Sequence, residues 1–124
     1  ALGVVGRIVS VSTHYSKVLL IIDQNSSVDC LIQRSRDRGI VKGLSTELCK
    51  VAYLVKSSDV ILGDQVVTSG LGGVFPKGLP LGQVVRIVDK PEELFKEVDV
   101  KPAVNFSKLE EVLIILHRKI SFDS

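Results

Sequence analysis

Apolar and polar residues alternate along most of this chain, and this period-two pattern predicts β-strands with one buried face. Turn-forming residues, such as Asp23-Gln24-Asn25-Ser26, interrupt the pattern at roughly the eight- to twelve-residue spacing of antiparallel folds. The expected strands cover residues 4–11, 18–22, 28–33, 39–42, 49–53, 65–69, 84–88, 95–100 and 112–116. We therefore expect an all-β protein with little helix, built as a barrel or sandwich.

Within these strands, alternation predicts which side chains share a face. Val28, Cys30 and Ile32 are expected on one face of their strand, and Cys49, Val51 and Tyr53 on one face of another. A bulge is expected at Gly6, which interrupts the first strand. Ser107 and Glu110 have the spacing of a capping box, which favours a single helical turn before the last strand.

The densest turn chemistry lies in residues 63–82, GDQVVTSGLGGVFPKGLPLG, which hold six of the ten glycines and two of the four prolines. This composition predicts a strand, a broad loop and a second strand. The glycines of the loop are expected to serve as structural turn residues, at least one of the first three having a positive φ angle. These are Gly70, Gly72, Gly73 and Gly78. A phosphate-binding loop is disfavoured, because Lys77 lies in no GxxxxGK[ST] motif and no helix follows.

The same loop carries apolar residues where a loop is normally polar. They are the candidate partner-binding residues Val74, Phe75, Pro76, Leu79 and Pro80. If exposed, they form an interaction surface with an aromatic anchor. In the alternative interpretation, Phe75 folds inward and closes one end of the barrel.

Composition narrows the functional classes. The net charge of +2 is too small for a dedicated nucleic-acid binder, and only Tyr15 and Tyr53 are tyrosines, with no tryptophan for base stacking. No apolar run is long enough to cross a bilayer, and no secretory signal is present. The chain begins within a strand pattern, so we expect it to be a piece of a longer protein.

The two cysteines, Cys30 and Cys49, lie within strand patterns. Buried free thiols that act as small hydrophobic side chains are the favoured interpretation. A disulfide, compatible with an oxidising compartment, remains open. Without a neighbouring ligand cluster, the pair does not predict a zinc site.

Three groups of polar residues are candidates for reactive or binding sites. His14, Asp29 and Ser69 follow the chain order of chymotrypsin-like triads, but Ser69 lacks a nucleophile motif, so strand-capping roles are favoured. The second group is acidic and consists of Glu92, Glu93, Glu97 and Asp99. It is expected to be a solvated face. The third group is basic and consists of Arg34, Arg36, Arg38 and Lys42. It is expected to form a charged hairpin that protects a sheet edge. No catalytic, cofactor-binding or metal-binding residue is predicted.

Residues 63–82 also carry a family resemblance: GD-x-VVTSGLGGVFPKGLP-x-G resembles the signature near the C-terminus of the rod shape-determining protein MreC family. The resemblance extends over most of the chain, in family order. It includes GVVGRIVSVS (3–12), KVLLIIDQNSSVDCLIQRSRDRGIVKG (17–43), KSSDVILGD (56–64) and VDVKPAVNFSKLEEVLII (98–115).

The resemblance implies two small six-stranded antiparallel β-barrels. The second barrel is expected at residues 16–89, inserted within a partial first barrel formed by residues 1–15 and 90–118. Residues 119–124 are expected to be a C-terminal tail.

The resemblance also implies a non-catalytic periplasmic scaffold of the bacterial cell-wall elongation machinery, which controls cell shape. Its implied partners are the class B penicillin-binding transpeptidase, which it would position and activate, the membrane protein MreD, and further copies of itself. Contact with MreB and tethering to the inner membrane would require an N-terminal part that this chain lacks. No cofactor and no nucleic acid are implied. The alternatives are a β-barrel adaptor domain of an efflux or secretion conduit, and a trypsin-like hydrolase.

Overall fold

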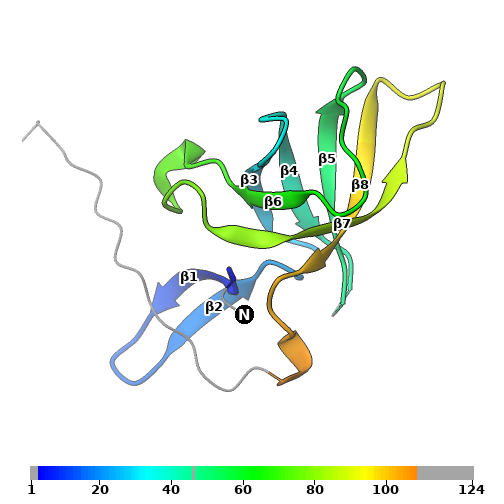
Figure 1. Ribbon diagram of the computed structural model, residues 1–124. Helices are drawn as coiled ribbons and strands as arrows, with labels where there is room; N and C mark the ends of the chain where they lie inside the picture. Colours follow the sequence, from blue (N-terminus) through cyan, green and yellow to red (C-terminus); the bar gives the residue numbers. More distant parts are fainter. Residues whose placement is uncertain (1–2, 46, 109–124) are drawn as a thin grey trace, which may run out of the picture.

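The computed structural model describes residues 3–45 and 47–108, which form eight β-strands and two short 3₁₀ turns (Figure 1). The strands are β1 (Gly6–Val11), β2 (Ser16–Leu20), β3 (Ser27–Ile32), β4 (Arg38–Gly43), β5 (Cys49–Val55), β6 (Gln65–Thr68), β7 (Pro80–Val88) and β8 (Phe95–Pro102). The 3₁₀ turns are η1 (Leu71–Gly73) and η2 (Phe106–Lys108). The predicted all-β class is confirmed. The expected strand at 112–116 and the position of Glu110 lie outside the described residues.

Six of the strands close into an antiparallel barrel in the order β3-β4-β5-β8-β7-β6, and β6 pairs back with β3. Closure leaves no free edge in this sheet, so every strand has a hydrogen-bonded neighbour on both sides. Pro80 fits because it is the first residue of β7, where a missing backbone donor is tolerated.

The other two strands, β1 and β2, form a separate two-stranded ribbon beside the barrel (Figure 1). Backbone hydrogen bonds hold its base: the Val4 amide donates to the Pro80 carbonyl at 2.8 Å, and Ile21 donates to Val5 at 3.0 Å. A bulge lies between Ile8 and Ser10, not at Gly6 as expected. A Cβ at Gly6 would lie 2.2 Å from the Leu19 carbonyl oxygen, so close approach to β2 explains the glycine instead.

Two strands lie elsewhere than the expected domain division placed them. β8 was assigned to the first barrel, at residues 90–118, but it closes the described barrel between β5 and β7. β2 was assigned to the second barrel, at residues 16–89, but it pairs with β1 outside. The reason is that β5 and β7 each need a partner for one side of their backbone, and β8 serves both. Whether the β1–β2 ribbon belongs to a first barrel stays a prediction, and residues 109–124 lie outside the description.

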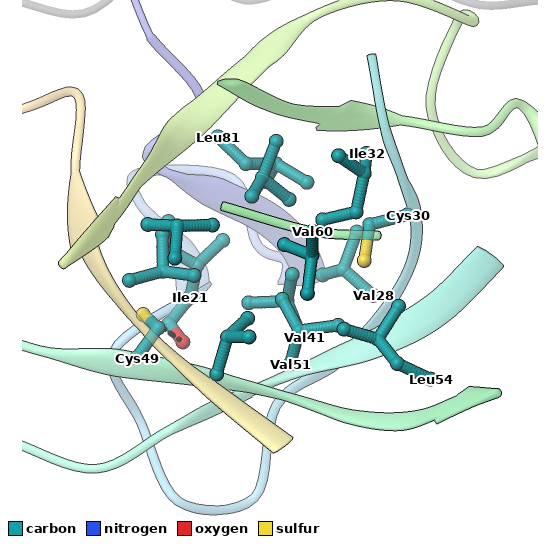
Figure 2. Packing of buried hydrophobic residues seen from close by; sticks show 14 of the residues in the cluster. Ile21, Val28, Cys30, Ile32, Val41, Cys49, Val51, Leu54, Val60 and Leu81 are labelled. Carbon is teal, nitrogen blue, oxygen red and sulfur yellow. Dashed lines mark hydrogen bonds between the residues drawn. The ribbon is translucent and has the colours of Figure 1, made fainter. Parts of the chain in front are cut away.

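Valine, isoleucine and leucine side chains, together with the two cysteines, fill the barrel interior (Figure 2). Val28, Cys30 and Ile32 share the buried face of β3, as predicted. Ile21, which follows β2, and Val4, which precedes β1, also join this core and fasten the ribbon to it.

Both cysteines are buried in this core as free thiols, which confirms the favoured interpretation. Burial raises the pKa of Cys30 to about 12 and that of Cys49 to about 11. A thiol with so high a pKa remains protonated at neutral pH and therefore behaves as a small hydrophobic side chain.

The prediction that Tyr53 shares a face with Cys49 and Val51 is wrong. Val51 of β5 pairs with Val98 of β8 and Leu54 pairs with Lys96, so β5 carries one extra residue over this interval. This β-bulge returns Leu54 to the core and leaves the Tyr53 side chain outside, half exposed, with a φ of 66°.

The segment between β5 and β6 is held against the β3–β4 turn by ionic hydrogen bonds. Arg34 donates from Nε and Nη2 to the two carboxylate oxygens of Asp64, at 2.9 and 3.0 Å. It also binds the Asp59 carboxylate at 3.1 Å. The Ile61 amide donates to Asp64 as well, at 2.9 Å. Asp64 is buried, and the hydrogen bond from Arg34 lowers the pKa of its carboxyl below the usual value.

Thr68, the last residue of β6, organises the glycine-proline loop. Its buried hydroxyl donates to the Pro76 carbonyl at 2.6 Å and accepts from the Leu79 amide at 2.8 Å. The backbone of Thr68 pairs with Leu79 and Gly78. All four turn glycines have positive φ angles: Gly70 81°, Gly72 78°, Gly73 70° and Gly78 86°. The expectation of at least one positive φ angle among Gly70, Gly72 and Gly73 agrees with these values.

Substituting Asp64 with Asn should make part of the stability independent of pH. The folded-state pKa of Asp64 lies below its unfolded value, so its stabilisation is present above about pH 4 and is lost as the pH falls through the folded pKa. Asp64→Asn should cost about 1–3 kcal/mol at pH 7 and less at pH 2. Urea unfolding at both pH values measures this, and an equal cost at both would contradict the ionic role.

Removing the Thr68 hydroxyl should destabilise the loop and the barrel together. Thr68→Val keeps the shape but leaves the Leu79 amide and the Pro76 carbonyl without this partner, at a cost of about 2–4 kcal/mol in the free energy of unfolding. The matched control is Thr68→Ser, which retains the hydroxyl and should cost about 1 kcal/mol through the lost methyl group. If both variants melt alike, the hydroxyl does not organise the loop.

Candidate interaction surface

The glycine-proline loop presents two large apolar side chains to solvent and turns other apolar side chains inward. Val74 is 50% exposed and Leu71 is 43% exposed, so these two form its outer face. Phe75 and Leu79 are half-buried and pack against the core cluster. Phe75 therefore lies as the alternative interpretation predicted, against one end of the barrel core. Pro76 is also half-buried, whereas Pro80 is exposed at the start of β7.

A shallow cleft of about 160 Å³ separates the loop from the start of β3 and the beginning of β1. Val74 and Phe75 line one side, and Arg7 and Asp29 contribute one charge of each sign on the others. An apolar face beside a few charged groups is the usual composition of a protein-binding surface. We define the loop surface as Arg7, Asp29, Leu71, Val74 and Phe75. The sequence did not indicate Arg7, because only folding brings β1 beside this loop, or Leu71, which stands alone between two glycines ahead of the apolar run.

The residues weighed as a triad are not brought together as one. The Ser69 amide donates to the Asp29 carbonyl at 3.1 Å, and this bond places Ser69 beside β3. Its hydroxyl accepts from the Leu71 amide at 3.2 Å, which is a local turn interaction. His14 lies in the exposed turn between β1 and β2, and none of the hydrogen bonds within residues 3–45 and 47–108 links it to Asp29 or Ser69.

The acidic residues spread over the β7–β8 hairpin and β8, where Asp99 lies 3.8 Å from Arg86. In the part of the chain that the structure describes, no group of three or more His, Cys, Asp or Glu side chains is arranged to hold a metal ion.

The basic residues do not form a single patch. Arg34 is engaged by Asp59 and Asp64, and Lys42 lies over the ring of Tyr53 at 5.3 Å. Arg36 and Arg38 remain exposed at the β3–β4 turn. Among the described helical turns, none is long and apolar enough to cross a membrane.

Comparison with known proteins places the whole barrel in one family. The family model described as "Rod shape-determining protein MreC, barrel core" matches residues 1–116. The cell shape-determining protein MreC of Caulobacter vibrioides is 44% identical over 87 residues, which are 70% of this chain and 25% of that protein. The Escherichia coli MreC is 32% identical over 114 residues, 91% of this chain and 31% of that protein. The chain thus spans about a quarter to a third of the length of these curated relatives.

Solved structures agree with the sequence match. The Pseudomonas aeruginosa MreC crystal structure superposes with a TM-score of 0.77 at 31% identity, over 82% of this chain and 66% of that one. A Helicobacter pylori MreC solved in complex with the penicillin-binding protein PBP2 gives 0.66 at 26% identity, over 80% and 62%. The major periplasmic domain of the cell shape-determining filament MreC gives 0.70 at 28%, over 82% and 65%. From its sequence and its fold alike, this chain belongs to the MreC family of rod shape-determining proteins.

Proposed function

We propose that this chain is a non-catalytic, periplasmic scaffold module that binds and positions a class B penicillin-binding transpeptidase of the cell-wall elongation machinery. The observation that carries the proposal is the structural match to an MreC bound to PBP2. That match covers 80% of this chain, so the part of the neighbour that resembles it includes most of the barrel. The match to a periplasmic MreC domain supports the compartment.

The described surface supports a binding role. Within the described residues the Ser69 hydroxyl accepts a turn hydrogen bond from the Leu71 amide, while the loop surface exposes apolar side chains beside opposite charges. Binding would favour one conformation of the transpeptidase by contacting that conformation more extensively than the others. The family match over residues 1–116 favours this function over a conduit adaptor or a hydrolase.

Within this function, the loop surface is our candidate contact for the transpeptidase. Phe75 and Leu79 anchor the loop in the core, so that Leu71 and Val74 are held outward on a fixed backbone. A preorganised apolar surface loses less conformational entropy on binding than a mobile one. We assign MreD binding and self-association to this periplasmic region as well, and MreB contact and membrane tethering to parts of the full-length protein outside this chain.

The direct experiment is a pull-down of this chain with the purified transpeptidase ectodomain from the same organism, followed by titration calorimetry. Saturable one-to-one binding is expected. The absence of binding by this chain and by a full-length periplasmic region would overturn the proposed function.

Replacing both outward side chains, Leu71→Ser with Val74→Ser, should weaken binding without unfolding the barrel. We expect the affinity for the transpeptidase to fall at least about fivefold, as for the loss of a contact worth 1 kcal/mol. The melting temperature should change little, because both side chains are about half exposed. Leu62→Ser, at an exposed leucine outside both the loop surface and the β7–β8 hairpin, is the matched control and should leave binding intact. Equal affinity of the parent and the double variant would remove the loop from the interface.

Phe75→Ala should instead act on folding, because the ring packs against the core. We expect a loss of about 2–4 kcal/mol in the free energy of unfolding, slightly below the range for a fully buried phenylalanine. Urea titration measures it. A variant as stable as the parent would contradict the packing role. It would favour the interpretation in which Phe75 is an exposed anchor for a partner.

A further inference from the structure

A second apolar cluster lies at the opposite end of the barrel from the glycine-proline loop. It consists of Tyr53 on β5 and of Leu94 and Phe95 where the β7–β8 hairpin enters β8. Leu94 is 83% exposed, Tyr53 50% and Phe95 43%. Figure 1 shows the hairpin tip projecting from the end of the sheet, far from the loop between β6 and β7. Three large apolar side chains exposed together at one end of the barrel are typical of an interaction site.

The two aromatic rings are held in a defined arrangement. Tyr53 and Phe95 meet edge to face, with ring centroids 5.6 Å apart and planes at 85°. The bulge in β5 directs Tyr53 to this surface, and its φ of 66° is a strained conformation for a tyrosine. Strained residues of this kind cluster at functional sites, where the surrounding structure maintains them.

Beside the rings lies a cleft of about 490 Å³, which is within the size range of ligand-binding clefts. Its charged lining is three carboxylates, Glu92, Glu93 and Glu97, against one ammonium group, Lys90. The nearby Lys56 does not compensate them, because it is bound to Asp89 at 2.6 Å. Lys42 lies over the Tyr53 ring, and the three carboxylates still outnumber the two ammonium groups of Lys42 and Lys90. The cleft is therefore apolar on one side and carries a surplus of negative charge on the other.

We propose that this hairpin cleft binds an extended segment of a partner protein in which a large apolar side chain stands next to Lys or Arg. The apolar side chain would pack on Tyr53, Leu94 and Phe95, and the cation would lie against Glu92, Glu93 and Glu97. This site is distinct from the loop surface. The proposal holds whether or not the loop surface binds the transpeptidase. It would give the barrel a second, chemically different contact.

Charge and size favour a peptide segment over other occupants. An anionic membrane surface would be repelled by the three carboxylates. A stable dimer of barrels buries about 1,600 Å², far more than the three side chains of this cluster can supply. A single anchored side chain with flanking ion pairs needs only a small area and gives weak, salt-sensitive binding.

The test uses the whole chain and a short fluorescein-labelled peptide with a central Leu-Phe pair flanked by Lys and Arg. Two matched peptides replace the basic residues with Glu, or the Leu-Phe pair with Ser-Gly. Fluorescence anisotropy should show saturable binding of the first peptide only, with an affinity that falls as salt is raised. Equal binding of the acidic peptide, or no binding of any peptide, would overturn the proposal.

Variants then locate the site. Leu94→Ser, and separately the charge reversal Glu92→Lys with Glu93→Lys, should each weaken peptide binding at least about tenfold. All three residues are exposed, so circular dichroism melts should match the parent. Leu71→Ser with Val74→Ser is the matched control and should leave peptide binding unchanged, so failure here is separable from failure of the transpeptidase site. If sedimentation instead shows a dimer that Leu94→Ser dissociates, a second copy is the occupant and the proposal is overturned.

Discussion

The rest of this structure depends on barrel closure by β8. This strand pairs with β5 on one side and β7 on the other, and without it both would present unpaired backbone groups. Closing six short strands around a narrow core requires strong coiling, and β-bulges supply it. Register shifts occur where β8 meets β5 and β7, and again between β6 and β7. The two surfaces proposed as binding sites follow from these local departures from regular pairing.

The bulge in β5 shows how closure shapes the surface. In regular alternation, Tyr53 would follow Val51 into the core and Leu54 would face solvent. The extra residue reverses this: Leu54 is fully buried, and Tyr53 meets Phe95 on the outside. One backbone irregularity therefore completes the core and creates the aromatic part of the hairpin cleft. At the other end, the Thr68 hydroxyl and four positive-φ glycines set the shape of the loop surface.

A scaffold gains from two preorganised surfaces at opposite ends of one rigid body. The loop surface is apolar with one charge of each sign, whereas the hairpin cleft is apolar and acidic. Different chemistry at the two ends would allow the two proposed partners to be bound and distinguished at the same time. Holding both on one barrel would fix their relative position without any catalytic step, in keeping with the scaffold function proposed for this family member.

The sequence by itself determined the β class, most strand positions, the buried thiols and the turn glycines, because these depend on local alternation and on backbone conformations that few residues tolerate. Its motifs also indicated the family. The tertiary structure alone decided that β8 closes the barrel, that Tyr53 faces outward, and that Arg7 lies beside the loop while Leu94 and Phe95 lie beside Tyr53. Strand partners and bulges depend on backbone groups far apart in the chain, and side-chain alternation carries no information about which distant strand supplies the missing hydrogen bonds.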